Sequence, residues 1–367
     1  MAQQAEHNGQ GPAVLGRRGF LRLAAGTMLT VLLPGCLHAP TLAPSPSVDT
    51  GWSDTKGYRK VPPWRFGRSG RGDVNAWMVM LSAHVEYGVQ EKYRDSFAEY
   101  LCTSANWDPN KQIEDIYILL KEGIDVLAID PMDTTVVAQG VTEAMEAGVP
   151  VILAASPLQK APYVGWVATD EEERGKACAD WLCQTIAGGH VLVLWSRPAA
   201  GDSQNWLRAV QHRLETQGSV QSTIASCPWA ASEARQATAA LLERNSPIAG
   251  VIVQNGVLGQ GVVQAFVERG KDIPPISGVD DHNGWLRLAR EHRVRFLALS
   301  GGANLGLRCV ELATQVLSGQ PVPRYLRFPY RTFEDTALDH YFRPDLSDAY
   351  WAVHDLPETW VERMFKP

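Results

Sequence analysis

Short continuous apolar runs alternate with amphipathic stretches along most of the chain. Continuous runs are typical of strands that helices cover on both faces. They predict strands over residues 77–81, 124–130, 149–153, 190–195, 249–253, 276–279 and 295–299. Apolar residues at helical spacing predict helices over residues 89–100, 113–123, 135–147, 203–217, 232–244, 257–270 and 305–317. Ser232 and either Thr134 or Thr135 are suited to cap two of these helices.

This alternation predicts an α/β fold built from right-handed βαβ units with parallel sheets. The pattern falls into two series, one before and one after about residue 170. We therefore predict two doubly wound, Rossmann-like lobes. In such sheets a ligand binds beyond the carboxyl ends of the strands, so the loops after the strands are the places to inspect.

Polar and aromatic side chains gather on those loops. The candidate ligand-binding residues are His84, Tyr87, Asp130, Trp206, Trp229, Asn255, Asp280 and Ser300. An Asp or Asn side chain can bridge neighbouring hydroxyls, and the C–H face of a sugar packs on an aromatic ring. The set predicts a site for a sugar or sugar-like molecule. Taken singly, Asp or Asn after a strand is as often a turn or cap residue, and Trp206 or Trp229 would equally suit a core position.

The N-terminal residues have the pattern of an export signal. Arg17 and Arg18 precede an apolar run over residues 23–33, which is short for a membrane span. We predict that residues 1–35 are a signal peptide, and its arginine pair resembles a twin-arginine signal. A cytoplasmic protein with a chance basic and apolar start is the weaker alternative.

The signal is followed by a cysteine and a segment of low complexity. Residues 33–36 resemble a bacterial lipobox, in which Cys36 would be lipidated, although Pro34 departs from the usual small residue. An exported protein cut elsewhere is the alternative. Residues 36–72 are rich in Pro, Ser, Gly and Thr and predict a flexible tether. We therefore expect a periplasmic or outer-face location, with the membrane contacted only through a lipid anchor.

The composition narrows the possible functions. The chain has 367 residues, of which 45% are hydrophobic, and a net charge of −6. An acidic chain argues against nucleic-acid binding, which needs a basic face. Zinc-protease, nucleophile-elbow, P-loop and Cys/His zinc motifs are absent from the sequence, so we expect a protein that is not an enzyme and has no cofactor or metal. Residues 201–203 match part of one hydrolase motif but also begin a predicted helix. The cysteines other than Cys36 are odd in number, and we expect most to be buried and free.

Several segments carry a family resemblance, and they occur in the order that the family has. They are residues 112–115, 123–129, 131–133, 143–151, 167–171, 175–176, 254–255, 259–261, 278–281, 341–346, 350–351 and 356–357. Together they make residues 74–352 resemble the ribose- and galactose-type sugar receptors of ABC importers, the type I periplasmic binding proteins. The resemblance implies a monomer that binds a sugar-like ligand between two lobes, closes by hinge motion and meets an ABC permease.

The resemblance also implies three crossovers between the lobes, near Thr169–Asp170, Ser300–Gly301 and Tyr325. The implied first lobe is residues 73–169 plus 301–324, the second lobe is 170–300 plus 325–352, and the tail is 353–367. The family's polar contacts would fall on Asn255 and Asp280, and a hinge-side contact on Ser300. Its aromatic wall would fall on Trp229 and on the loop with His84 and Tyr87.

Three departures from the family bear on the ligand. An Asp-Arg pair of many members is Ala155-Ser156 here, a helix-starting Arg is absent near Trp206, and an Asn-Asp pair is Asn255-Gly256. We therefore expect a less hydroxylated, modified or aromatic-bearing ligand, or a sugar held mainly by stacking. The fold leaves one alternative partner open, a membrane sensor kinase or chemoreceptor in place of the importer. A transcription regulator would need an N-terminal helix-turn-helix, which the sequence does not show.

Overall fold

The structure, a computed structural model, describes residues 49–73, 75–133, 135–196, 201–244, 247–300 and 302–367. The predicted signal peptide (1–35), the predicted lipidation site Cys36 and the predicted cap Thr134 lie outside the described residues, as do the side chains of residues 201–203. None of the described helices has the length and apolar character needed to cross a bilayer.

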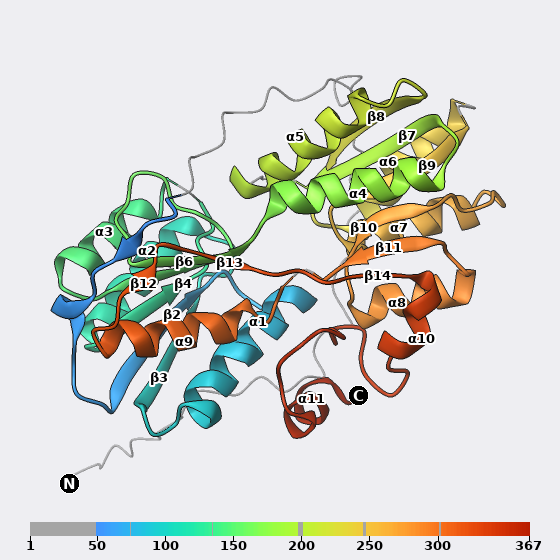
Figure 1. Ribbon diagram of the computed structural model, residues 1–367. Coiled ribbons are helices and arrows are strands. Elements are labelled where there is room, and N and C mark those ends of the chain that lie inside the picture. The colour runs from blue at the N-terminus through green and yellow to red at the C-terminus, as the bar shows by residue number, and fades with distance from the viewer. Residues whose placement is uncertain (1–48, 74, 134, 197–200, 245–246, 301) are drawn as a thin grey trace, which may run out of the picture. The chain divides into compact units, whose positions relative to one another are not determined.

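Two six-stranded sheets organise the described chain (Figure 1). The first sheet has the order β13 (Tyr325–Phe328), β6 (Gly165–Thr169), β5 (Val151–Ala154), β4 (Val126–Ile129), β2 (Trp64–Gly70) and β3 (Phe97–Ser104). The second has the order β14 (Thr332–Glu334), β11 (Phe296–Leu299), β10 (Ile276–Val279), β9 (Ile248–Val253), β7 (Gly189–Ser196) and β8 (Val220–Cys227). All neighbouring strands run parallel except β14, which is antiparallel to β11. The predicted pair of doubly wound α/β lobes is confirmed.

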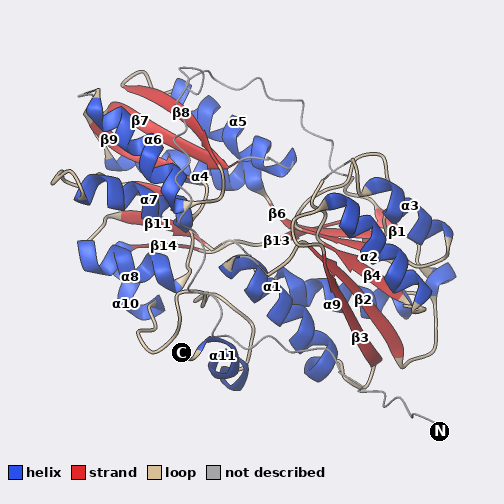
Figure 2. Cartoon of the chain, turned by 180° about the vertical axis from the view of Figure 1, so that it is seen from behind, coloured by secondary structure: helices blue, strands red, loops and turns tan. Residues whose placement is uncertain are grey.

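Helices cover both faces of the first sheet (Figure 2). The helices are α1 (Ala76–Tyr87) and α9 (Leu305–Leu317) on one face, and α2 (Pro109–Lys121) and α3 (Ala138–Glu146) on the other. Side chains alternate along a strand, so Val126 and Ala128 join the cluster under α1 and α9. Leu127 and Ile129 join the cluster under α2 and α3. The continuous apolar run of β4 thus serves two cores. We call this sheet and its helices the first lobe.

The second sheet is covered in the same way. The helices are α4 (Glu171–Thr185) and α5 (Gly201–Glu215) on one face, and α6 (Ala231–Glu243), α7 (Gly256–Val267) and α8 (Asn283–His292) on the other. Val191 and Val193 of β7 pack toward α4 and α5, whereas Leu192 and Leu194 pack toward α6, α7 and α8. The short helix α10 (Leu338–Tyr341) adds to the latter cluster. We call this sheet and its helices the second lobe.

The chain passes between the two lobes at three places. It leaves the first sheet after β6, returns from β11 to α9, and leaves again after β13. The third passage, expected near Tyr325, does not begin at that residue, because Tyr325 begins β13, which pairs in parallel with β6 from Trp166 onward. The passage lies instead between Phe328 and Thr332, the end of β13 and the start of β14.

The N-terminal part of the first lobe corrects the sequence prediction most. Residues 77–81 are not a strand but part of α1, where the side chain of Asn75 caps the helix by accepting a hydrogen bond from N of Met78 at 3.0 Å. The first long strand is β2, inside the predicted tether 36–72. The tether prediction is therefore wrong over this stretch. It is also wrong at β1 (Trp52–Ser53), which pairs with β12 (Val322–Pro323).

Other predicted boundaries also change. The helix predicted over residues 89–100 is wrong over residues 97–100, which belong to the edge strand β3, whereas Gly88–Lys92 form a π-helical turn directly after α1. Ser232 does not cap α6, since its cap is Ala230 without a side-chain hydrogen bond. Thr135 does not cap α3, which begins after Val137. The predicted tail 353–367 contains the buried helix α11 (Glu358–Phe365).

Candidate functional site

At the carboxyl edge of the first sheet, one guanidinium contacts two loops. Arg71 follows β2, Asp130 follows β4, and Ser156 lies just beyond β5. Nη2 of Arg71 lies 2.8 Å from Oδ1 of Asp130 and also donates a hydrogen bond to Oγ of Ser156. Ala155 has φ 58°, in the left-handed region that is uncommon for a residue with a Cβ and often marks a functional loop. Parallel neighbouring strands thus bring three separate loops to one point.

The polar atoms of this pair are incompletely satisfied. Asp130 is only 3% exposed, yet neither of its carboxylate oxygens accepts a well-aligned hydrogen bond from the described residues, and Nε of Arg71 has no acceptor there. Burial raises the pKa of Asp130, and the charges of Arg71 and Arg68 oppose the rise. Burying a polar group without a partner is costly, so this edge is suited to a ligand that both donates and accepts hydrogen bonds.

The backbone around Asp130 is firmly held. Nε2 of the buried Gln112 on α2 donates to the carbonyl of Asp130 at 2.9 Å, and Oε1 of Gln112 accepts from N of Met132 at 2.9 Å. A cavity with room for about one water molecule lies beside the carboxylate. Its walls include the buried Arg68 and the thiol of Cys309. The carboxylate is therefore presented by a rigid loop.

At the carboxyl edge of the second sheet, Asn255 and Asp280 lie together, as expected. Oδ1 of Asn255 caps α7 by accepting from N of Leu258 at 2.9 Å, and Nδ2 of Asn255 lies 3.4 Å from Oγ of Ser196. Oδ2 of Asp280 accepts from N of Gly256 at 3.0 Å. A side chain at position 256 would not fit, because its Cβ would lie 2.5 Å from Oδ1 of Asp280. This contact explains the glycine where the family often has Asp.

A buried histidine completes this second edge. Nδ1 of His282 donates to Oδ1 of Asp280, and both side chains are buried. Burial alone would lower the pKa of His282, but the charge of Asp280 raises it above its ordinary value. Burial would raise the pKa of Asp280, but His282 lowers it. The neighbouring Asp281 has no such cation bonded to it, and burial raises its pKa to about 7.

Arg174 is a further buried cation. It lies on α4, and its Nη1 donates to Oε1 of Glu171 at 2.6 Å. Its Nε has no acceptor among the described residues. Burial would lower the pKa of Arg174, but the charges of Glu171 and Asp280 raise it. Within the part of the chain that the structure describes, a buried guanidinium N–H without an acceptor thus lies on the loop after β2 and another on α4.

The remaining predicted residues divide into those near the edges and those elsewhere. Ser300 follows β11 and is buried, and its N donates to the carbonyl of Arg331 at 2.8 Å. Trp229 lies between β8 and α6 and is 43% exposed, so its role stays a prediction. Trp206 has no exposed surface and packs in the core with α4, which is the alternative named for it above.

His84 and Tyr87 are not on a loop after a strand. Both lie on α1, and His84 has no exposed surface. The ring of Tyr87 lies 5.5 Å from that of Trp360 on α11. The expected aromatic wall at these positions is therefore wrong, because the segment that holds them is helical and covered by the C-terminal helix.

Sequence reasoning missed Arg71, Ser156, Ser196, Arg174 and His282. Recognition of β2 would have placed Arg71 directly after a strand, on the loops inspected for ligand contacts. His282 lies two residues after Asp280, so the sequence could have suggested that the two side chains are close. The pairing of Arg71 with Ser156 had no local signal. Among the described residues, no group of three or more His, Cys, Asp or Glu is arranged to hold a metal ion. The cysteines at positions 102, 178, 183, 227 and 309 are free, and Cys102 is exposed.

Comparison with known proteins decides the family. The family model described as "Periplasmic binding protein domain" matches residues 73–321. The chain belongs to this family. Its members act outside the cytoplasmic membrane, and the relatives are binding proteins rather than enzymes.

Relatives and solved structures agree with this assignment. The ribose import binding protein RbsB of Bacillus subtilis (strain 168) is 22% identical over 245 residues, which are 66% of this chain and 80% of that protein. A Mycobacterium smegmatis protein in complex with β-D-fucofuranose has a TM-score of 0.69 at 20% identity and covers 76% of this chain and 93% of its own. A fructose-binding periplasmic domain of a hybrid two-component system has a TM-score of 0.68 at 19% identity, with coverage of 76% and 93%. These likenesses show the fold.

Proposed function

We propose that the protein captures a neutral sugar or sugar-like molecule between the carboxyl edges of its two sheets and delivers it to an ABC importer. One observation carries the proposal. Asp130 is buried at a sheet edge and ion-paired with Arg71, yet among the described residues neither carboxylate oxygen accepts a well-aligned hydrogen bond and Nε of Arg71 has no acceptor. A hydroxyl group is both donor and acceptor, so adjacent hydroxyls of a sugar would satisfy both.

The charges at the two edges favour a neutral ligand. Arg71 pairs with Asp130, Arg174 with Glu171, and Asp280 with His282, while the buried Arg68 beside Asp130 is acted on by the charge of Asp73. A charged ligand would leave one of these groups or its own charge uncompensated in a poorly solvated place. Neutral hydroxyls instead gain charge-assisted hydrogen bonds.

Arg71 also changes the ligand expectation that we drew from the three departures from the family pattern. Ser156 occupies the position where many members have an arginine. The guanidinium of Arg71, which lies on another loop, donates a hydrogen bond to Ser156 and so occupies the same region. The loss of that arginine is therefore not evidence for a poorly hydroxylated ligand. Stacking on the half-exposed Trp229 remains compatible with a hydroxylated ring.

The mechanism follows from ligand contacts to both lobes. A ligand that bonds Asp130 on one edge and Asn255 or Asp280 on the other binds the closed arrangement more tightly than the open one. It therefore shifts the population toward closure. The importer would recognise the closed form.

Two further parts of the proposal concern the partner and the anchor. The fructose-binding sensor domain favours a second candidate, a receptor that signals to a membrane kinase. Export by the twin-arginine route and lipidation at Cys36 would hold the monomer at the outer face of the membrane. Mass spectrometry of the native N-terminus tests the anchor, because a diacylglyceryl group adds a defined mass to Cys36.

The ligand proposal is tested by calorimetry and melting curves with D-ribose, D-fructose, D-fucose and xylitol. A bound sugar raises the melting temperature with RT ln(1 + [L]/Kd). Asp130→Asn should weaken binding about tenfold or more, since one charge-assisted hydrogen bond is worth about 1.5–3 kcal/mol. Asp95→Asn is the matched control, because that carboxylate is exposed. Equal affinities in the two variants, or turnover of any of these compounds, would contradict the proposal.

A further inference from the structure

The C-terminal segment, residues 343–365, is fixed to the second lobe through its backbone. Nδ2 of Asn283 on α8 donates to the carbonyl of Arg343 at 2.7 Å. Further along, N of Val353 donates to Oδ2 of Asp281 at 2.6 Å. Asp281 directly follows Asp280, so the segment is attached immediately beside the second sheet edge.

Two residues later the same segment is bonded to the first lobe. N of Asp355 donates to Nε2 of His84 at 3.1 Å, and Oδ2 of Asp355 accepts from Nδ2 of Asn304 at 3.0 Å. Nδ1 of His84 donates to the carbonyl of Met80 at 2.8 Å, which leaves Nε2 as the acceptor. His84 lies on α1 and Asn304 precedes α9, so both partners belong to the first lobe.

Helix α11 extends this attachment with an apolar contact. Trp360 and Phe365 are almost fully buried, in one cluster with Met80 and Ala83 of α1. The rings of Trp360 and Tyr87 meet edge to face with centroids 5.5 Å apart. The helix therefore covers an apolar face of the first lobe that would otherwise meet water.

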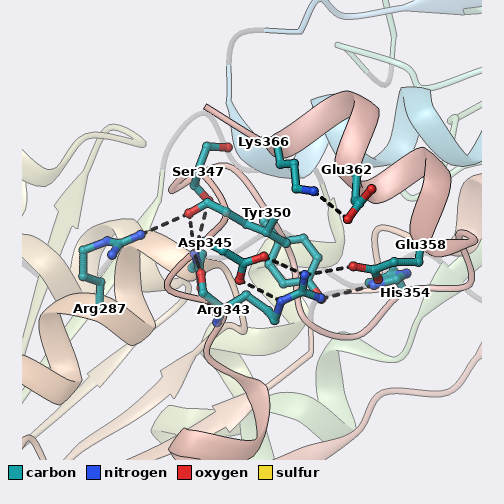
Figure 3. A network of polar contacts seen from close by, with 11 residues as sticks. Arg287, Arg343, Asp345, Ser347, Tyr350, His354, Glu358, Glu362 and Lys366 are labelled. Carbon is teal, nitrogen blue, oxygen red and sulfur yellow. Dashed lines mark hydrogen bonds and ion pairs between the residues drawn. The ribbon is translucent and has the colours of Figure 1, made fainter.

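A polar network ties α11 back to the part of the segment on the second lobe (Figure 3). Nη2 of Arg343 lies 2.8 Å from carboxylate oxygens of both Asp345 and Glu358. N of Ser347 donates to the carbonyl of Phe365 at 2.8 Å. The segment thus holds together as a unit and touches both lobes.

We propose that residues 343–365 form a latch that limits how far the two lobes separate in the ligand-free protein. The attachment to Asp281 at Val353 and the attachment to His84 at Asp355 are two residues apart. A fully extended chain spans only about 3.3–3.6 Å per residue, so this stretch has little slack. A wide hinge opening must therefore break the attachment to the first lobe, which is the bonds of Asp355 and the contact between α11 and α1, or the attachment to the second lobe at Asp281 and Asn283. The latch goes beyond ligand capture and does not depend on which sugar binds.

The test uses the ligand-free mature protein, so its outcome is independent of the proposed ligand. Asp355→Pro removes the N–H donor and the carboxylate together. Asp355→Asn keeps an N–H and an acceptor oxygen and is the matched control. Trp360→Ala weakens the apolar contact, and Lys366→Ala removes an ion pair that lies within the segment. X-ray scattering measures lobe separation, and hydrogen exchange measures the opening of residues 353–365.

Asp355→Pro with Trp360→Ala should increase the radius of gyration and speed amide exchange in α11 about tenfold or more, as expected for a locally opened unit. Asp355→Asn and Lys366→Ala should leave both values near those of the natural chain. Unchanged scattering in a variant that circular dichroism shows to be folded would overturn the latch. If Trp360→Ala prevents folding, Asp355→Pro alone decides, because it changes only a loop residue.

Discussion

The carboxyl edges of the two sheets each carry a buried aspartate beside a cation, but the two aspartates differ in how many of their oxygens have hydrogen-bond donors. On the second edge, both oxygens of Asp280 have donors, N of Gly256 and Nδ1 of His282. On the first edge, Asp130 pairs with Arg71, but its oxygens accept no well-aligned hydrogen bond from the described residues. A buried ion pair whose polar atoms all have hydrogen-bond partners stabilises the fold. A buried pair with atoms that lack partners can gain free energy when a ligand supplies them. We propose that the second edge is already complete without ligand, as a prebuilt wall, and that the ligand completes the first edge.

The largest expected effect separates the two carboxylates by stability. Asp280→Ala should lower the free energy of unfolding by about 3–5 kcal/mol, because it leaves the cation of His282 buried without its partner. Asp130→Asn should cost less, about 1–2 kcal/mol, because burial already disfavours the charged form of Asp130 and Arg71, with 16% of its side chain exposed, can meet water. Urea unfolding of both variants measures the difference. Similar losses would show that the two edges do not differ in the way described.

The second prediction concerns the close packing of the prebuilt wall. Gly256→Ala should destabilise the protein by about 1–3 kcal/mol, because its Cβ would lie 2.5 Å from Oδ1 of Asp280 and 2.7 Å from Cε1 of His282. Gly218→Ala is the matched control, since a Cβ there meets no atom within 4 Å. Unfolding curves should separate the two variants clearly. Equal losses of stability in the two variants would show that the packing around Gly256 is less tight than these distances indicate.

The third prediction uses the raised pKa of Asp281. Its pKa is about 7 in the folded chain against 3.8 for the ordinary group, so the folded state keeps the proton longer. The stabilisation of the folded state that comes from this raised pKa is fully present below pH 3.8 and is lost as pH rises through about 7. The free energy of unfolding falls over that range by at most about 1.4 kcal/mol per pH unit. Asp281→Asn, which stays neutral, should flatten the fall in stability between pH 4 and pH 7. Parallel pH profiles for both proteins would contradict the assignment.

The smallest effect on stability is expected at Trp229. Because this side chain is 43% exposed, Trp229→Ala should change the free energy of unfolding by less than about 0.5 kcal/mol. If a sugar ring stacks on it, binding should weaken about fivefold, in line with about 1 kcal/mol for an aromatic contact. Trp206→Phe provides the contrast, because Trp206 is a core residue and should lose stability instead. Calorimetry and unfolding together distinguish the two roles.

The C-terminal segment shows where reasoning from sequence stopped short. The motifs at residues 350–351 and 356–357 carried part of the family resemblance, yet residues 353–367 were expected to be a tail. His84 was expected to contact ligand because a strand was predicted before it. Its actual partner, N of Asp355, lies 271 positions further along the chain. No local pattern signals a contact across that separation.

The sequence alone determined the alternation of β4, α2, β5, β7, β9, α7, β10, β11 and α9, because each has a strong local period and clear turn residues at its ends. It also placed Asn255 and Asp280 at strand ends. It did not determine β2, whose two arginines and three glycines or serines look like a linker until the strand is paired between β3 and β4. Only the tertiary structure brought Arg71, Asp130 and Ser156 together. Periodicity is a property of neighbours along the chain, whereas the meeting of three loops depends on the order of the strands in the sheet.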